Sequence, residues 1–263
     1  MLGVLIADAE KRAGLLGSRA SLLRRHAAAS PAPPAFGAAL ASGKSVAVIA
    51  ELKRRSPSRG DINAALDLET RARAYVDGGA AALSVLTQTS HFGGTAADLA
   101  DVAAVVDRPL LRKDFIVSPL QIVEARGLGA SAVLLIARGL SPTLLRSLAV
   151  AAGDEGLETL IEVRDEAELE RALESRANVV GVNNRNLETL AIDAAVSERL
   201  IPLIPPGVPA VYESGISDRS GVDHAARCGA DAVLVGSSLS AAPEGVAAVR
   251  ALVGVTRLGR GER

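Results

Sequence analysis

The chain has 263 residues, of which 49% are apolar and 22% charged, and this length suffices for one large α/β domain with a deep core. Its formal net charge of −1 and its 2% aromatic content argue against a nucleic-acid partner, because such proteins use clustered positive charge and stacking rings. The single cysteine, Cys228, excludes an internal disulfide, and the three histidines lack metal-ligand spacing, so we expect no metal site. No apolar run approaches the ~18 residues of a membrane span, and we expect a cytoplasmic protein.

Residues 1–45 are predicted to form a helical extension ahead of the main repeat. The first 29 residues predict one or two helices, because apolar residues recur at helical spacing: Leu2, Ile6, Ala9, Ala13 and Leu16. Three prolines between residues 31 and 34 predict a stiff link. A short helix over residues 36–42 is then expected to lead into the first strand.

Residues 46–252 alternate between apolar runs typical of buried strands and amphipathic stretches typical of helices. The expected strands are Val46–Ala50, Ala82–Leu86, Leu110–Arg112, Ala132–Ile136, Glu158–Glu162, Val179–Val182, Ala210–Tyr212 and Ala232–Val235. The expected helices lie near 67–78, 96–105, 118–128, 141–153, 165–174, 193–200, 218–228 and 243–252. Several of these helices begin with good capping signals, Ser118-Pro119, Ser141-Pro142 and Ser217-Asp218.

Eight βα units predict an α/β fold, a (β/α)8 TIM barrel, in a single domain that spans residues 1–263. A doubly wound open sheet is the competing architecture, but its ligands gather at one switch point, whereas polar residues here follow nearly every strand. Residues 253–263 are expected to form a flexible tail.

The polar residues at strand ends predict an active site. Glu51 and Lys53 stand two apart after the first apolar run, so both side chains point to one face. The later strands end in Lys113, Glu162, Asn183 and Glu213. Each residue alone is more typical of a solvated rim or an ion pair. Five ionisable groups and an asparagine on the same barrel face favour a catalytic site.

Two loops of small residues predict an anion site. Ser214-Gly215 follows the seventh strand and Gly236-Ser237 follows the eighth, where barrel enzymes often hold a phosphate. The alternative is two ordinary turns, but both loops carry the pattern. The loop of residues 56–60, with Ser56 and Arg59, is expected to close over the same anion.

Seven segments resemble the indole-3-glycerol phosphate synthase family of tryptophan biosynthesis: VIAELKRRSPSRGDI, ALSVLT, LLRKDFIVSPLQIVEARGLGASAVLLI, LIEVRDEAEL, GVNNRNLETL, ESGIS and DAVLVGSSL. They span roughly residues 46 to 240 in family order, and the N-terminal helices also resemble the family. The resemblance implies conversion of 1-(2-carboxyphenylamino)-1-deoxyribulose 5-phosphate to indole-3-glycerol phosphate, with release of CO2 and water. It implies a phosphorylated small-molecule substrate and no metal or organic cofactor.

The resemblance also implies roles for the ionisable residues. Lys113 matches the general acid, and Lys53 matches a second lysine that either orients the substrate carboxylate or acts as an acid in the dehydration. Glu162 matches the base of the dehydration. Glu51 matches the carboxylate that stabilises the cationic intermediate or holds the lysines.

Further residues match groups that support or bind the substrate. Asn183 matches a polar group that binds the reacting substrate, and Glu213 is expected to support the lysine network. The residues that match phosphate- and substrate-anchoring positions are Ser56, Ser214, Gly215, Gly236 and Ser237. The residues expected to wall the anthranilate ring are Phe115, Leu83 and Leu134.

The chain departs from the family pattern in two places. The family commonly has an acidic residue near Gln88 and an aromatic residue near His91, so the loop after the second strand is expected to close differently. Tyr212 is bulkier than the usual residue and is expected to crowd the floor of the mouth. We interpret His91 as a surface residue of the loop.

Two other functions fit a phosphate-binding barrel. A barrel like phosphoribosylanthranilate isomerase would need a catalytic cysteine, and Cys228 lies late in an expected helix, away from any strand end. A non-catalytic barrel that binds a phosphorylated ligand would not need the whole ionisable set. Whichever of these functions applies, the main one included, we expect a monomer or a weak homo-oligomer.

Overall fold

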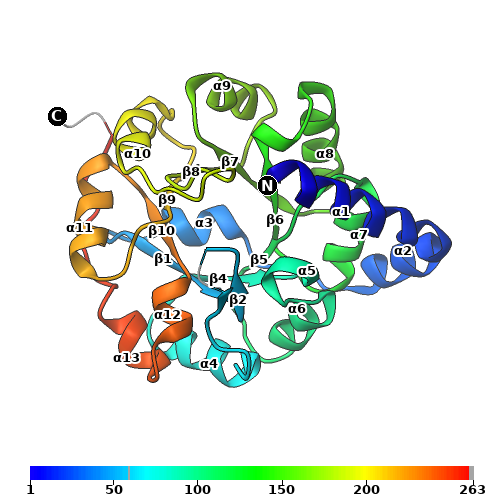
Figure 1. Cartoon of the computed structure of the whole chain (residues 1–263), viewed down its shortest axis with the longest axis horizontal. Coiled ribbons are helices and arrows are strands. Elements are labelled where there is room, and N and C mark those ends of the chain that lie inside the picture. Colours follow the sequence, from blue (N-terminus) through cyan, green and yellow to red (C-terminus); the bar gives the residue numbers. More distant parts are fainter. Residues whose placement is uncertain (59, 261–263) are drawn as a thin grey trace.

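The computed structural model describes residues 1–58 and 60–260, and Figure 1 shows helices arranged around a central barrel. The barrel strands are β1 (Ala47–Leu52), β4 (Ala82–Leu86), β5 (Leu110–Lys113), β6 (Ala132–Ile136), β7 (Glu158–Val163), β8 (Val179–Asn183), β9 (Ala210–Glu213) and β10 (Ala232–Val235). All neighbours are parallel, and β1 pairs with both β4 and β10, which closes the sheet. The predicted TIM barrel is therefore confirmed, and the open sheet is excluded.

The helices around the barrel follow the expected order, and their bounds lie within three residues of the prediction. They are α4 (Leu68–Asp77), α6 (Ala96–Ala103), α7 (Pro119–Gly127), α8 (Pro142–Asp154), α9 (Glu166–Glu174), α10 (Ala195–Leu200), α11 (Arg219–Cys228) and α13 (Gly245–Arg250). Ser118, Ser141 and Asp218 each accept a hydrogen bond from a backbone N–H in the first turn of the helix that follows, so the capping signals are confirmed. Within the described residues, none of the helices combines the length and apolarity needed to cross a bilayer.

Several short elements were not predicted, and most lie at the carboxyl ends of the strands. They are the helices α5 (Thr89–Phe92) and α12 (Ser237–Ala241), the hairpin of β2 (Arg55–Ser56) with β3 (Gly60–Asp61), and the 3-10 turns η1 (Gly17–Arg19), η2 (Ala137–Gly139) and η3 (Ile201–Leu203). Elements of two to five residues are too short to show a hydrophobic period, so they are difficult to predict from the sequence.

The N-terminal extension contacts both ends of the barrel. It consists of α1 (Leu2–Leu16), α2 (Ala20–Ala29) and α3 (Phe36–Ala41), and in Figure 1 the N-terminus lies over the barrel. Leu5 of α1 belongs to the apolar cluster that also contains Phe115 and Leu134. At the opposite end, the backbone N–H groups of Phe36 and Gly37 each donate to Glu158 at 2.8 Å, which caps α3 against the start of β7.

The segment of residues 253–260 makes specific contacts, which differs from the expected flexible tail. Val255 is buried, and its carbonyl accepts from the N–H of Val46 at 2.8 Å. Arg257 donates to the carbonyls of Ala41 and Gly43, which ties the segment to the extension. Residues 261–263 of the expected tail lie outside the described residues.

Candidate active site

The ionisable residues at the strand ends meet in one cavity at the carboxyl end of the barrel. Side chains along a strand alternate between the barrel interior and the surrounding helices. Glu51, Glu162 and Glu213 point inward from β1, β7 and β9, and Lys113 and Asn183 end β5 and β8 beside them. These residues and Lys53 line a cavity of about 320 Å³, which suits a small-molecule ligand.

The two lysines form short ion pairs with the carboxylates. Nζ of Lys113 donates to Oε2 of Glu213 at 2.6 Å and lies 3.9 Å from Oε2 of Glu162. Nζ of Lys53 donates to Oε1 of Glu51 at 2.6 Å. All five side chains are at most 13% exposed, so their charges interact more strongly than they would in water.

The pairing keeps Lys113 and Glu51 ionised. Burial alone lowers the pKa of Lys113, but the surrounding carboxylates, that of Glu213 first, outweigh burial and raise it above its ordinary value. Burial alone raises the pKa of Glu51, but the ammonium groups of Lys53 and Lys113 outweigh burial and lower it. At neutral pH the resting site therefore presents an ammonium beside a carboxylate.

Glu162 behaves differently from the other carboxyl groups. Burial and the negative charge of Glu213 raise the pKa of Glu162 to about 7, and the ammonium of Lys113 offsets this only in part. A carboxyl group that titrates near neutral pH suits a residue that exchanges a proton during a reaction. Glu162 is therefore the candidate general base of the cavity.

Asn183 is held in a defined orientation beside Glu162. Its Oδ1 accepts from Oγ of Ser214 and from the backbone N–H of Arg185, each at 2.9 Å. Because the carbonyl oxygen is occupied, the NH2 group is directed away from it, and a hydrogen bond from Asn183 lowers the pKa of Glu162. The amide therefore contributes a fixed donor to the site.

Two glycines leave room for the carboxylates. A Cβ at Gly236 would overlap Oε1 of Glu51 and lie 2.9 Å from Nζ of Lys53. A Cβ at Gly181 would overlap Oε1 of Glu213. The sequence analysis assigned Gly236 only to a phosphate-binding loop. It did not identify Gly181, although Gly181 occupies an inward position on β8.

The residues expected to bind the anion all line the same cavity: Ser56, Ser214, Gly215, Gly236 and Ser237. Ser214 and Gly215 have φ of +69° and +95°, so this loop turns through left-handed backbone conformations. The unpredicted helix α12 begins at Ser237, immediately after β10, and a short extra helix after the eighth strand is a frequent part of barrel phosphate sites. Arg59, expected in the closing loop, lies outside the described residues.

The apolar wall differs from the expected one. Phe115 and Leu134 line the cavity, but Leu83 does not. Leu83 is fully buried among the residues between the sheet and the helices, because it lies one residue out of phase with the inward positions of β4. Leu86, on the inward side of the same strand, lines the cavity in its place.

The sequence also missed several residues of the cavity. Leu5 reaches it from α1, and Phe92 reaches it from α5, where its ring lies 6.5 Å from that of Phe115. Arg185 and Leu187 line it from the loop after β8. The amphipathic pattern of α1 predicted a helix, but no local signal shows that this helix reaches the mouth of the barrel.

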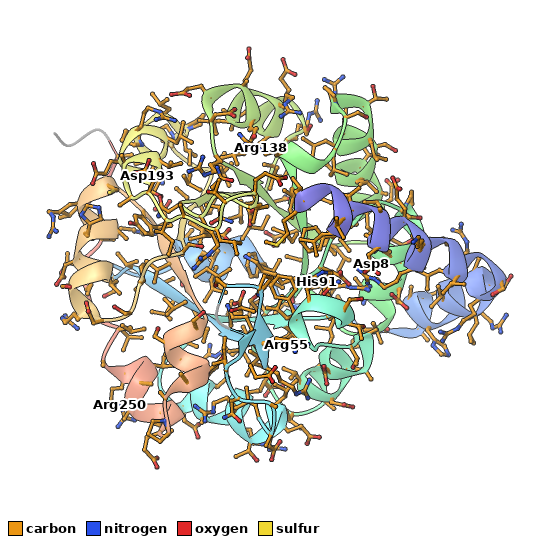
Figure 2. The ribbon with its side chains drawn as sticks, in the orientation of Figure 1. Asp8, Arg55, His91, Arg138, Asp193 and Arg250 are labelled. Carbon is orange, nitrogen blue, oxygen red and sulfur yellow. The ribbon has the colours of Figure 1, made fainter. Side chains whose placement is uncertain are left out.

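The departures from the family pattern lie outside the charged cluster. Tyr212 points away from the mouth, contrary to expectation, and packs edge-on against His224 with ring centroids 6.0 Å apart. Gln88 is fully buried, accepts from the N–H of His91 at 2.8 Å and donates to Asp8 of α1 at 3.1 Å. In Figure 2, Asp8 and His91 mark the place where α1 meets the loop after β4.

Cys228 lies at the end of α11 and does not line the cavity. Its Sγ lies 3.8 Å from Nε2 of His224. An isomerase of this kind requires a cysteine at the barrel mouth, and Cys228 does not meet this requirement. Within residues 1–58 and 60–260, the side chains of His, Cys, Asp and Glu form no group of three or more suited to hold a metal ion.

The closed barrel and its buried lysine–carboxylate cluster define a (β/α)8-barrel enzyme of the acid–base type. A model of the family "indole-3-glycerol phosphate synthase" matches residues 6–252 of the chain. The chain belongs to the indole-3-glycerol phosphate synthase family, a family of carboxy-lyases in tryptophan biosynthesis.

Curated relatives support this assignment over most of the chain. The indole-3-glycerol phosphate synthase of a Nocardioides species is 49% identical over 252 residues, which cover 95% of this chain and 94% of that protein. The enzyme of the same name from Opitutus terrae is 48% identical over 228 residues, which cover 84% of this chain and 86% of that protein. The 3-hexulose-6-phosphate synthase from Salmonella typhimurium has a TM-score of 0.63 at 15% identity, covers 79% of this chain and 96% of that one, and shares the fold alone.

Proposed function

We propose that Lys113 is the general acid and Glu162 the general base by which this chain converts 1-(2-carboxyphenylamino)-1-deoxyribulose 5-phosphate to indole-3-glycerol phosphate. The observation that carries this proposal is the geometry of the Lys113 ammonium. It is paired to Glu213 at 2.6 Å and lies 3.9 Å from Glu162, whose pKa is raised to about 7. Lys113 rests as an ammonium that can donate a proton to a developing oxyanion, and Glu162 exchanges protons near neutral pH.

Ring closure requires a carbon of the anthranilate ring to attack the ribulose carbonyl. As the new C–C bond forms, negative charge develops on the carbonyl oxygen, and Lys113 donates a proton to it. Glu51, kept ionised by the two lysines, stabilises the positive charge that develops on the substrate. Loss of CO2 then breaks the bond between ring and carboxyl group and returns its electron pair to the ring system.

Dehydration completes the indole ring. Glu162 removes a proton from the ring-closed intermediate, and the hydroxyl group leaves as water after protonation by an ammonium group. Lys53 either protonates this hydroxyl or orients the carboxylate of the substrate. Rapid-quench turnover of Lys53→Met separates the two roles, since the ring-closed intermediate accumulates only if Lys53 acts in the dehydration.

The remaining residues of the cavity bind and orient the substrate. The backbone N–H groups of Gly215, Gly236 and Ser237, with the hydroxyl of Ser56, hold the phosphate. Phe115, with the other apolar residues of the wall, packs on the anthranilate ring. These contacts bring the ring carbon and the carbonyl together before the chemistry begins.

A fluorescence assay of the purified protein with this substrate, in the presence of EDTA, tests the proposal. We expect indole product to form in the wild-type protein and in Lys44→Ala, an exposed control, whereas Lys113→Ala binds substrate without turnover. Turnover by Lys113→Ala would contradict its role as the acid. Saturable binding without product in the wild-type protein would instead indicate a non-catalytic barrel.

The cytoplasmic location and the monomeric or weakly oligomeric state stay predictions. Sedimentation equilibrium over a range of protein concentrations tests the second of them. A tight oligomer at the lowest concentration would contradict it.

A further inference from the structure

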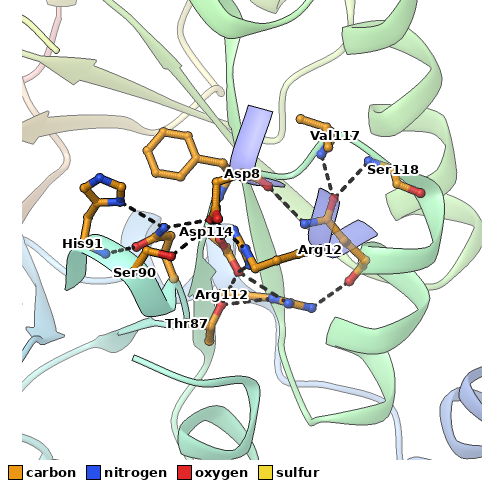
Figure 3. Close-up of polar contacts among 12 residues, drawn as sticks. Asp8, Arg12, Thr87, Ser90, His91, Arg112, Asp114, Val117 and Ser118 are labelled. Atoms are coloured by element: carbon orange, nitrogen blue, oxygen red, sulfur yellow. Dashed lines mark hydrogen bonds and ion pairs between the residues drawn. The ribbon is translucent and has the colours of Figure 1, made fainter. Parts of the chain in front are cut away.

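Asp114, the residue after Lys113, is a buried carboxylate in a network that Figure 3 shows in detail. Its Oδ1 accepts from Nη2 of Arg12 and from the backbone N–H of Phe115, both at 2.8 Å. Its Oδ2 accepts from Nη1 of Arg12 at 3.1 Å and from Oγ1 of Thr87 at 2.8 Å. The carboxylate is therefore held on both oxygens.

The charge of Asp114 depends on two arginines. Burial raises the pKa of Asp114, but Arg12 and Arg112 outweigh burial and lower it, so the group is ionised. Nη2 of Arg112 lies 3.5 Å from Asp114 and 2.8 Å from Glu124, so this arginine is shared between two carboxylates. Arg12 binds Asp114 with both Nη atoms, the geometry of a strong charge-assisted pair.

The network fixes the backbone on both sides of Asp114. The N–H of Thr87 donates to the carbonyl of Lys113 at 3.1 Å, while its hydroxyl donates to Asp114. The N–H of Phe115 is held by the side chain of Asp114 itself. Lys113, the proposed acid, and Phe115, which lines the cavity, thus flank Asp114 in the chain. The hydrogen bonds of the Asp114 carboxylate fix the backbone between them.

One turn of α1 organises this region. Asp8 and Arg12 stand four residues apart on one face of the helix, and Nε of Arg12 donates to Asp8 at 3.0 Å. Asp8 also accepts from Gln88, the residue after Thr87. The same turn therefore docks the loop after β4 and supplies the counter-ion for the turn after β5.

We propose that Asp114 is a positioning residue for the reaction and that Arg12, from the N-terminal extension, holds the carboxylate of Asp114 in place. The pair holds the backbone of Lys113 and Phe115 so that the ammonium and the ring meet the substrate together. The inference rests on the proposed role of Lys113. In this proposal α1 does more than pack over the barrel, because it also positions residues of the active site.

The test compares Asp114→Asn, Arg12→Gln and the double variant with the wild-type protein. Arg19→Gln is the matched control, because Arg19 is an exposed arginine of the same extension. Turnover and KM are measured at a temperature at which circular dichroism shows every variant to be folded. Melting temperatures are recorded separately, because a merely structural role would change them alone.

We expect Asp114→Asn to lower kcat about 10²-fold, the effect of a displacement of roughly 1 Å at a catalytic group, and to raise KM. Arg12→Gln should lower kcat by less, because Thr87 and the other arginine still hold Asp114. The double variant should be no worse than Asp114→Asn, because Arg12 acts through that carboxylate.

Wild-type kcat and KM in folded Asp114→Asn and Arg12→Gln, beside an active wild-type protein, would overturn the inference. If Asp114→Asn does not fold, Arg12→Gln carries the test alone, since the Arg12 side chain is 26% exposed. An inactive wild-type protein would instead refute the proposed function.

Discussion

Replacing Glu162 by Gln is expected to stabilise the fold at alkaline pH while it abolishes turnover. Glutamine keeps the shape of the protonated carboxyl group but neither ionises nor accepts a proton as a base. The pKa of Glu162 is about 7 in the folded protein, against an ordinary value of 4.5. The group is therefore destabilised in its ionised form by the same surroundings that make it a candidate base.

The magnitude follows from the difference between the two pKa values. Between pH 4.5 and 7 the folded protein holds a proton that the unfolded chain has lost, so the stability contributed by Glu162 is complete below pH 4.5 and lost as the pH rises to about 7. A difference of about 2.5 pH units (7 − 4.5) corresponds to roughly 3 kcal/mol. The free energy of unfolding of Glu162→Gln minus that of the wild-type protein should therefore rise by this amount from acid to alkaline pH.

Urea unfolding of both proteins at pH 5 and pH 8 measures this gain. The free energy of unfolding of the variant minus that of the wild-type protein should rise by roughly 2 to 3 kcal/mol from pH 5 to pH 8. Over the same range wild-type kcat should rise and level off above pH 7, because the base must be deprotonated. A difference in stability that is independent of pH, or that falls with pH, would refute the reasoning.

Three further predictions follow from the positions of single side chains. Gly236→Ala should lower kcat/KM at least tenfold because the new Cβ overlaps the carboxylate of Glu51, whereas Gly153→Ala, with open space around it in α8, should raise stability by up to ~1 kcal/mol in urea titrations. Leu134→Ala should raise KM, whereas Leu83→Ala should lower the free energy of unfolding by about 2–5 kcal/mol and leave KM unchanged. Glu158→Gln should lower the melting temperature by weakening the cap of α3, at a cost of about 1–2 kcal/mol and without a change in kcat.

The alternation of apolar runs and amphipathic stretches was sufficient to predict the barrel, because each strand buries both faces and each helix buries one. It was also sufficient to predict which strand ends bear charge. The positions of Leu83 and Tyr212 were wrong for a reason that the sequence already contained. Because Glu213 points inward, its neighbour Tyr212 must point outward, and the same alternation on β4 places Leu86 inward and Leu83 outward.

The contribution of α1 was not predictable by the same reasoning. Arg12 and Asp114 are 102 residues apart, and their pairing depends on the angle at which the extension crosses the barrel mouth. The spacing of apolar residues in α1 specifies a helix with one buried face but not the surface that covers this face. The bidentate contact and the buried position of Gln88 therefore emerge only from the folded arrangement.

The pairing within the charged cluster accounts for the separate behaviour of Glu162. Each ammonium lies 2.6 Å from one carboxylate, Lys53 from Glu51 and Lys113 from Glu213, and the charge of Arg185 also acts on Glu51. Burial and the charge of Glu213 raise the pKa of Glu162, and the one ammonium near it, at 3.9 Å, is already engaged and offsets them only in part, whereas the pKa of Glu51 falls. The unequal distances within the cluster therefore separate the candidate base from the two carboxylates that hold the lysines.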